Sequence, residues 1–319
     1  MHRSLTGVLA VVLLSGCLHK MGADRVERHG WHRVHAGGEE TTYDERFERV
    51  GYRLEEVGCD EIAKGEGDPK KPIIVLLHGA GGEGVEMKKA VPLLADSRPA
   101  MFWVLRWSPW DRREALVTQL AAGLSRLAEC VPGAPGRIVV LGHSAGGVLA
   151  SLAVGRVVPP RNAPDDWLTV VTIAAPLSGH VRGTDHGPEP AFIFDLANTP
   201  DYPPAVPGVR VLHLRTSLPG DVQMTPFVGH VPNDVRVGVP GAPQIDLPEE
   251  LSHAGALVYV SYLFADGSFS SWLEPRRPDE ARQATQSSGK SGGATGIPKR
   301  SGRRGARESM RPMTDLLQW

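Results

Sequence analysis

The sequence predicts an α/β fold in which helices cover both faces of a mostly parallel sheet. Short apolar segments rich in β-branched residues recur along the chain, and residues 72–77, 138–141 and 168–173 are the clearest of them. Runs of this kind are typical of strands that are buried on both faces. Segments with helical character lie between them, residues 112–128 included, as the crossover connections of parallel strands require.

Chain length and net charge limit the size of the domain and the class of partner. The chain has 319 residues, enough for one large α/β domain with short extensions, which we place at residues 41–273. Lysine and arginine number 35, aspartate and glutamate 36, and the formal net charge is −1. A balance this close to zero gives no reason to expect a specific nucleic-acid partner.

The first 16 residues have the pattern of an export signal. A basic start precedes an apolar stretch at residues 5–14, which is shorter than the ~20 residues of a membrane-spanning helix. The stretch ends in Leu-Ser-Gly-Cys17, which resembles the lipobox of bacterial lipoproteins. The resemblance implies cleavage before Cys17, lipidation of its sulfur and anchoring in the cell envelope. Leu18 favours the outer membrane under the sorting rule of enteric bacteria, and the alternative is an ordinary signal peptide with an incidental cysteine.

Residues 17–40 are mostly polar and are predicted to form a tether. His29, His32 and His35 recur every three residues, a spacing that suggests a metal site. Gly30 and the mixed surroundings favour a solvated linker instead. We therefore expect no metal and no cofactor.

Residues 41–62 fit two early strands, with candidate core positions at Phe47, Val50, Tyr52 and Leu54. A turn separates this segment from the strand at residues 72–77.

Two further cysteines, Cys59 and Cys130, lie within the predicted domain. An exported location permits a disulfide between them, and two separate buried thiols are the alternative. Sequence does not give the distance between the two Cα atoms, so both alternatives stay open.

A Gly-His-Ser-Ala-Gly segment, residues 142–146, connects a buried strand to a helix of small residues. Ser144 would lie at the apex of a tight turn, and side chains at Gly142 and Gly146 would collide with the neighbouring strand and helix. The arrangement resembles the nucleophile elbow of α/β-hydrolases, and the resemblance extends over about residues 70–265. It implies the α/β-hydrolase fold, with Ser144 as the nucleophile.

A glycine-rich turn, residues 78–82, follows the strand at residues 72–77. In α/β-hydrolases a strand that ends in His-Gly at this place supplies half of the oxyanion hole. The resemblance therefore assigns the two donors to the N–H groups of Ala80 and Ala145, with Gly81 as competitor for the first role. Loss of one such donor typically costs ~2.7–4 kcal/mol of transition-state stabilisation. Taken alone, the turn could be a glycine-rich connection without a catalytic role.

Residues 101–105 predict the next strand, and residues 112–128 predict an amphipathic helix whose leucine stripe packs into the core. The turn at residues 174–179, Ala-Ala-Pro-Leu-Ser-Gly, resembles the A-P-x-x-G turn of many lipases. The long, proline-rich connection at residues 177–207 carries an apolar patch around Phe192, and we expect a short cap over the substrate pocket. A surface loop whose apolar residues pack down is the alternative.

A serine hydroxyl needs a neighbouring base that is itself oriented by an acid. α/β-hydrolases present these groups in the order serine, acid, histidine. Residues 209–214 predict a strand, and Asp221 lies in the loop that follows, where the family has its acid, so Asp221 is the first choice. Asp234 is the main rival and Asp195 a more distant one. As an alternative, Asp221 beside Gly220 could be only a turn former.

His253 precedes a helical stretch at residues 258–264, as the family's histidine precedes the last helix. The resemblance therefore assigns His253 as the base. His230 is the competitor, because it too follows a candidate acid. His213, inside a strand, and His143, inside the elbow, are expected to be structural.

Residues 274–319 are rich in serine, glycine and arginine and have little to bury, which predicts a disordered basic tail. Contact with anionic lipid headgroups or cell-surface polymers is one use of such a tail. A solvated tail without function is the commoner case.

These features predict a membrane-anchored serine hydrolase of lipase or carboxylesterase type, whose partner is a small-molecule or lipid ester. Thioesterases, acyltransferases and peptidases use the same triad and differ in their pockets. A non-catalytic binding lipoprotein on the same scaffold is a further alternative. The intact set of Ser144, Asp221 and His253 argues against it.

Overall fold

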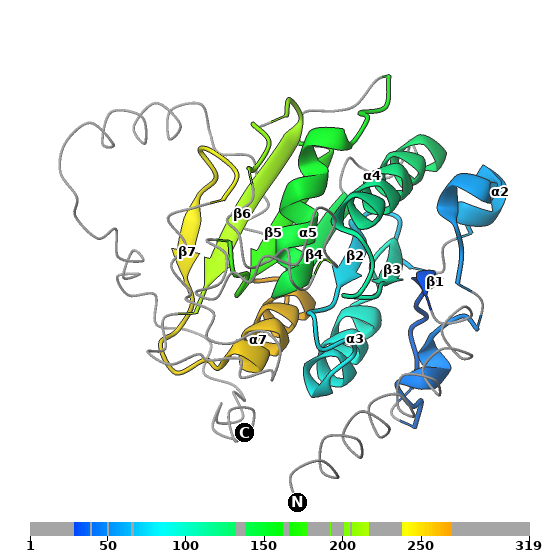
Figure 1. Ribbon diagram of the computed structural model, residues 1–319. Coiled ribbons are helices and arrows are strands. Elements are labelled where there is room, and N and C mark those ends of the chain that lie inside the picture. The colour runs from blue at the N-terminus through cyan, green and yellow to red at the C-terminus, as the bar shows by residue number, and fades with distance from the viewer. Residues whose placement is uncertain are drawn as a thin grey trace, which may run out of the picture. The chain divides into compact units, whose positions relative to one another are not determined.

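A sheet with one antiparallel edge strand organises the structure, which is a computed structural model (Figure 1). It describes residues 29–38, 40–49, 51–64, 67–131, 138–161, 166–177, 192, 201–204, 206–216 and 238–269. All of these belong to one compact unit, Met1–Phe269, and the second unit, Ser270–Trp319, lies outside the described residues.

Among the described residues, the sheet has seven strands in the order β1-β3-β2-β4-β5-β6-β7. They are β1 (Gly30–Arg33), β2 (Ile73–Leu77), β3 (Met101–Arg106), β4 (Ile138–His143), β5 (Leu168–Ile173), β6 (Val209–Arg215) and β7 (Gln244–Asp246). β1 pairs with β3 in the antiparallel sense, and every other pair is parallel. The mostly parallel sheet predicted from the apolar runs is confirmed.

The strand order reverses around β2. The chain runs from β2 outward to β3 and then returns past β2 to β4. In open parallel sheets such a reversal leaves a crevice beyond the carboxyl ends of two neighbouring strands, where ligands bind. Leu77 at the end of β2 is level with Gly142 near the end of β4. The turns that follow these two strands therefore lie side by side.

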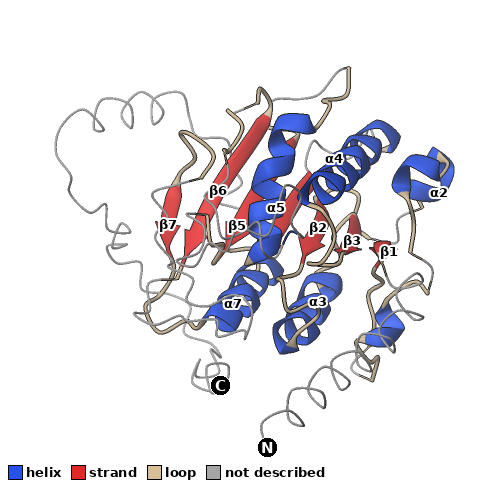
Figure 2. Cartoon of the chain, viewed as in Figure 1, coloured by secondary structure: helices blue, strands red, loops and turns tan. Residues whose placement is uncertain are grey.

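Helices cover both faces of the sheet (Figure 2). They are α2 (Cys59–Ile62), α3 (Val85–Asp96), α4 (Arg113–Cys130), α5 (Ala145–Ala153) and α7 (His253–Ala265), with 3-10 helices η1 (Asp44–Arg46), η2 (Leu54–Glu56) and η3 (Val154–Arg156). α4 and α5 share a buried cluster with Ile73 and Val75 of β2, whereas the intervening Ile74 is buried outside that cluster. Because successive strand residues face opposite sides, α3 and α7, which contact each other, cover the second face.

The predicted tether at residues 17–40 is wrong at its carboxyl end, because Gly30–Arg33 forms the edge strand β1. Trp31 is completely buried, and a Cβ atom on Gly123 of α4 would collide with its indole ring. With four residues and one large apolar side chain, β1 is too short for its pattern to stand out. Its strand conformation depends on antiparallel pairing with β3.

The two strands predicted within residues 41–62 are also wrong. The segment forms η1, η2 and α2, and its extended parts make only isolated bridges, from Phe47 to Val34 and from Tyr52 to Trp31. Two of the predicted core positions, Phe47 at 7% exposure and Leu54 at 0%, are nevertheless buried. The segment packs along the edge of the sheet, so its side chains reach the core without a continuous strand.

Cys59 and Cys130 are joined by a disulfide, with their Cα atoms 4.7 Å apart. The bond ties α2 to the carboxyl end of α4 across a sequence separation of 71 residues. The structure thus has the disulfide and not the pair of separate thiols.

Candidate active site

Ser144 lies at a sharp turn between β4 and α5. Its φ of 54° and ψ of −126° fall in a region that residues other than glycine seldom adopt, and such strain is typical of functional sites. The turn is held on both sides, because the Ser144 N–H donates to the Ile173 carbonyl and the Gly147 N–H donates to the Ser144 carbonyl, both at 2.9 Å. This is the geometry of a nucleophile elbow.

The two glycines of the elbow lie where a Cβ atom has no room. At Gly142 it would lie 2.7 Å from the carbonyl oxygen of Gly146. At Gly146 it would lie 2.5 Å from the carbonyl oxygen of His78 and 2.7 Å from that of Leu77. All three obstacles are backbone atoms, so a side chain at either position would push β2, β4 and α5 apart.

The glycine-rich turn after β2 lies directly beside Ser144. A Cβ atom on Gly79 would lie 3.0 Å from Ser144 Cβ and 3.5 Å from Ser144 Oγ. The Gly82 N–H donates to the Gly79 carbonyl at 3.0 Å, which closes the turn. The structure thus brings the Ala80 peptide next to the nucleophile, while Ala145 begins α5, where backbone N–H groups have no intrahelical acceptor.

His78 fixes the orientation of the Gly79–Ala80 peptide. The Trp107 N–H donates to His78 Nε2 at 3.2 Å, so Nε2 is an acceptor and the ring proton is on Nδ1. Nδ1 then donates to the Gly79 carbonyl at 2.7 Å. Burial lowers the pKa of His78, which keeps the ring neutral. In a trans peptide the C=O and the N–H point in opposite directions, so a fixed Gly79 carbonyl also fixes the Ala80 N–H.

His253 is the first residue of α7, and the preceding Ser252 caps the helix by accepting from the Gly255 N–H at 3.0 Å. The helix therefore begins at His253 rather than several residues later, as the sequence had indicated. The His253 ring lies 4.8 Å from the His143 ring, centre to centre. Since His143 immediately precedes Ser144, the structure brings the candidate base to the nucleophile elbow.

Comparisons with known proteins bear on this arrangement. Residues 102–211 match the family model for lipase (class 3), a stretch that is shorter than half of the chain and includes the Ser144 elbow. A search of curated proteins finds no match to the sequence. The strand order, the antiparallel edge strand and an elbow after β4 together decide the fold. The chain has the α/β-hydrolase fold.

Solved structures resemble this chain at low identity. The mature lipase BlEst2 of Bacillus licheniformis is 14% identical with a TM-score of 0.39, over 66% of this chain and 95% of that chain. Esterase B from Lactobacillus rhamnosis is 13% identical with a TM-score of 0.34, over 68% and 76%. A poly(3-hydroxybutyrate) depolymerase from Bordetella parapertussis is 16% identical with a TM-score of 0.35, over 69% and 84%. At these identities and scores the likeness carries no information about substrate.

The predicted acid falls in the connection between β6, which ends at Arg215, and β7, which begins at Gln244. Asp221 and Asp234 both lie in this connection, outside the described residues. Four other predictions also fall outside the described residues: Asp195, His230, the lipidation site Cys17 and the basic tail at residues 274–319. His213, expected to be structural, is fully buried in β6, with Nδ1 2.8 Å from Thr172 Oγ1.

One residue of the predicted cap is described beside the glycine-rich turn at residues 78–82. Phe192 is 1% exposed, and its ring centre lies 5.4 Å from that of Trp107. The Phe192 N–H donates to the Asp111 carbonyl at 2.8 Å. Trp107 in turn stacks on His78 at 4.9 Å. An aromatic layer therefore extends from residues 177–207, most of which lie outside the described residues, to the turn that carries Ala80.

The three histidines of the N-terminal segment do not converge on one site. His32 Nδ1 lies 3.1 Å from the Glu48 carbonyl oxygen, and His35 Nε2 lies 3.3 Å from Glu48 Oε1. Within the described ranges, no three histidine, cysteine, aspartate or glutamate side chains are grouped as metal ligands would be.

Sequence reasoning missed two parts of the site. Trp107 belongs to none of the predicted motifs, yet its backbone sets the tautomer of His78. His143 was expected to be structural only, yet it contacts His253. The position of His143 inside the elbow motif was the available signal, because any side chain there must lie close to the groups around Ser144.

Proposed function

We propose that the protein is a serine hydrolase that cleaves carboxylic esters, of lipase or carboxylesterase type. The observation that supports this most is the strained turn at Ser144, which has Gly79 directly beside it and whose preceding residue, His143, contacts His253 at the start of α7. Nucleophile, oxyanion donors and base then come from three separate segments that the sheet reversal gathers at one edge.

The reaction follows from these positions. His253 takes the hydroxyl proton as Ser144 Oγ attacks the acyl carbonyl, and the N–H groups of Ala80 and Ala145 stabilise the resulting oxyanion. His253 then returns the proton to the leaving alcohol. A water molecule, activated by the same histidine, releases the acyl group from Ser144 as a carboxylic acid and restores the hydroxyl.

The acid that orients His253 is Asp221 in this proposal. It is the first acid in the connection from β6 to β7, and β7 leads on to the base. Asp221→Asn is expected to lower kcat by about 10⁴-fold, the effect of the same change in a serine protease. Asp234→Asn is the matched variant and is expected to have little effect. The reverse result would move the role of acid to Asp234.

Attachment to the bacterial cell envelope through Cys17 is a further part of the proposal. It rests on the apolar leader and on the lipobox-like Leu-Ser-Gly-Cys segment. No helix within the described ranges is both long and apolar enough to cross a membrane. Mass spectrometry of the mature N-terminus tests the anchor: a lipid-modified Cys17 is expected, and an unmodified N-terminus would contradict it. Cys17→Ser is expected to release the protein from the membrane fraction.

A fluorophosphonate probe tests the nucleophile. Wild type is expected to be labelled, and Ser144→Ala is expected not to be labelled. The control Ser151→Ala, seven residues further along the chain in α5, should be labelled as wild type is. Ser151 suits this control because its Oγ donates to the Gly147 carbonyl at 2.9 Å within the helix. Esters graded by acyl length, a thioester and an added alcohol acceptor then separate ester hydrolysis from thioester hydrolysis and acyl transfer. Unchanged labelling of Ser144→Ala would overturn the proposal.

A further inference from the structure

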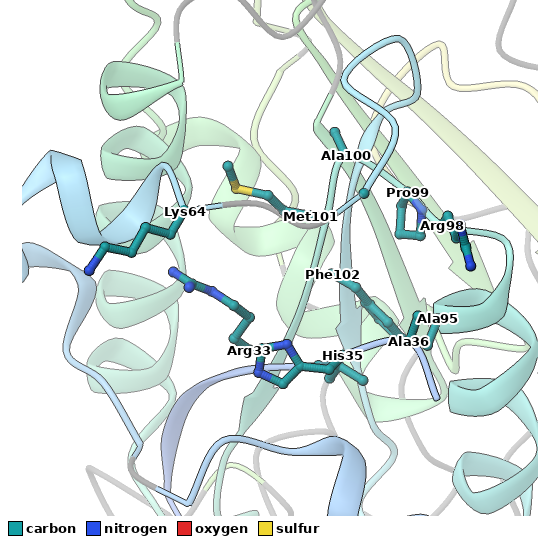
Figure 3. A pocket seen from close by; sticks show the side chains of 12 residues that line it. Arg33, His35, Ala36, Lys64, Ala95, Arg98, Pro99, Ala100, Met101 and Phe102 are labelled. Atoms are coloured by element: carbon teal, nitrogen blue, oxygen red, sulfur yellow. The ribbon is translucent and has the colours of Figure 1, made fainter. Parts of the chain in front are cut away.

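A cavity lies between the end of β1, the segment after α2, the end of α3 and the start of β3 (Figure 3). Its volume is about 260 Å³. Among the described residues that line it, four carry or can carry positive charge, namely Arg33, His35, Lys64 and Arg98, and none is acidic. Figure 3 shows Arg33 and Lys64 on one side and Arg98 on the other.

This cavity is separate from the site around Ser144. Met101, which lines it, is the first residue of β3 and is level with Ile73, which is level with Ile138 at the start of β4. Ser144 follows the other end of β4. At ~3.3 Å per residue the strand places these two edges of the sheet about 17 Å apart.

Arg33 is a fixed cation in this cavity. Its side chain is 9% exposed, and its Nη2 donates to the carbonyl oxygens of Glu61 at 2.6 Å and Ile62 at 3.4 Å. The guanidinium carbon lies 4.8 Å from the centre of the Trp103 ring. Its Nε, which is buried, has no hydrogen-bond partner among the described residues.

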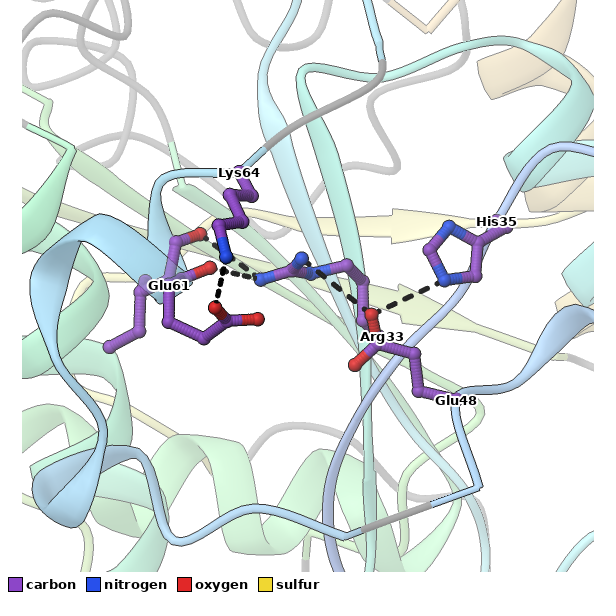
Figure 4. A network of polar contacts seen from close by, with 6 residues as sticks. Arg33, His35, Glu48, Glu61 and Lys64 are labelled. Atoms are coloured by element: carbon purple, nitrogen blue, oxygen red, sulfur yellow. Dashed lines mark hydrogen bonds and ion pairs between the residues drawn. The ribbon is translucent and has the colours of Figure 1, made fainter.

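Two ion pairs at the cavity determine the charge that a ligand can balance (Figure 4). Glu48 pairs with Arg33, with Nη1 and Oε1 3.6 Å apart, and Glu61 pairs with Lys64. Arg98 is exposed and forms no ion pair within the described part of the chain. Among the described residues, two carboxylates therefore offset two of the three permanent cations and leave one positive charge in excess, which one carboxylate neutralises and a dianion exceeds.

The remaining lining is apolar. Met101 and Phe102 of β3 form part of the wall together with Pro99. A pocket with apolar walls and a few polar groups is typical of sites for small organic ligands, and inorganic anions gain nothing from such walls. We propose that this cavity binds a small organic monocarboxylate, with its carboxylate between Arg33 and Arg98 and its short carbon chain against Met101 and Phe102. Ester hydrolysis releases a carboxylate, so the cavity would sense the reaction product. This sensing role rests on the proposed function, whereas carboxylate binding does not.

Methionine methyl NMR on the full chain tests the proposal locally. Sodium hexanoate is added to wild type and to Ser144→Ala, at constant ionic strength. The Met101 methyl signal is expected to shift and saturate in both proteins, while the signal of Met87, fully buried on α3, stays in place. Inorganic phosphate and neutral hexanamide are expected to bind at least about tenfold more weakly, because each lacks one of the two matching features.

Two variants locate the binding. Arg98→Gln is expected to weaken hexanoate binding about fivefold, as for loss of an exposed ion pair, and Lys88→Gln, on the exposed side of the same region, is expected to change nothing. Ala36→Phe keeps every charge but fills the exposed mouth of the cavity, and should abolish the Met101 shift. The proposal is overturned by a Met101 signal that does not move, by equal weakening in Lys88→Gln, by phosphate binding as tightly as hexanoate, or by unchanged binding in Ala36→Phe. Since Ser144→Ala is part of the titration, failure of the proposed enzyme activity leaves this result unaffected.

Discussion

The Nε2 atom of His143 lies 3.0 Å from the carbonyl oxygen of His253. A carbonyl oxygen only accepts, so Nε2 carries a proton and donates it. His143 is 1% exposed and immediately precedes Ser144, and its partner is the backbone of the candidate base. This hydrogen bond therefore fixes the start of α7 relative to the nucleophile elbow.

His143→Leu is expected to lower kcat by about 10- to 100-fold with a small change in KM, because a displaced base costs up to ~10²-fold in rate for ~1 Å. His143→Gln places an amide donor near the position of Nε2 and is expected to recover most of that loss. The pH profile of kcat/KM gives a second readout, since a displaced His253 would shift its acidic limb, where the base becomes protonated. Equal activity in the two variants, or a loss that follows only the melting temperature, would assign His143 a purely structural role.

Gly79→Ala is expected to lower kcat by about 10-fold or more, because its Cβ would lie 3.0 Å from Ser144 Cβ and would displace the nucleophile or the oxyanion turn. Gly81→Ala is the matched control in the same turn, since a Cβ there meets no atom within 4 Å. It is expected to stay within about twofold of wild type. Steady-state kinetics on one ester substrate compares the two, and similar losses in both would show that the turn responds to flexibility and not to the contact with Ser144.

Removal of the Cys59–Cys130 disulfide is expected to lower the free energy of unfolding by about 4 kcal/mol on the loop-entropy estimate for a separation of 71 residues. The double variant Cys59→Ser with Cys130→Ser and reduced wild type should lose similar amounts in urea titrations. The kcat should not change while the protein stays folded, because neither cysteine contacts the site. A wild-type stability that is indifferent to reductant would contradict this prediction.

Burial lowers the pKa of His213 to about 4. The unfolded chain has a histidine pKa of about 6.5, so it takes up the proton first as the pH falls. Stability from this residue is fully present above about pH 6.5 and decreases towards pH 4, by about 3 kcal/mol in total. Urea titrations at pH 7, 5.5 and 4 measure the loss.

His213→Asn removes the titrating ring and retains a polar group near Thr172. Its stability should depend less on pH than that of wild type over the same range, even if it is lower at pH 7. The difference between the two proteins is the relevant quantity, because burial also lowers the pKa of His78. Parallel curves for the two proteins would exclude His213 as the source of the acid sensitivity.

The strongest sequence patterns were those in which local chemistry alone determines the structure. β2 is an uninterrupted apolar run, β4 begins with four apolar residues, and β5 is apolar except for two threonines. The elbow has glycines at the two positions where only backbone fits. β1 had no such pattern, because its four residues become a strand only by pairing with β3. The segment at residues 41–62 has the buried side chains expected of strands, but its backbone follows the edge of the sheet in short helical turns.

The candidate site also has a part that local sequence predicts and a part that it does not. Ser144, Gly79 and Ala80 could be located from motifs, since each belongs to one continuous segment whose conformation is local. The contact between His143 and His253 joins residues that are 110 apart in sequence, and no local pattern encodes such a pairing. The stacking of His78 on Trp107 is hidden for the same reason. Tertiary packing decides both.

The disulfide also has a consequence for when this protein becomes stable. Thiols stay reduced in the bacterial cytosol and are oxidised after export. Under the proposed export, a chain that is still in the cytosol would lack the bond between α2 and α4, and with it a sizeable part of a typical domain's net stability. A loosely folded precursor is easier to translocate and leaves the nucleophile elbow poorly supported. Oxidation outside the cytosol would then act as the maturation step, so that the producing cell's own esters are spared until the enzyme has reached its destination.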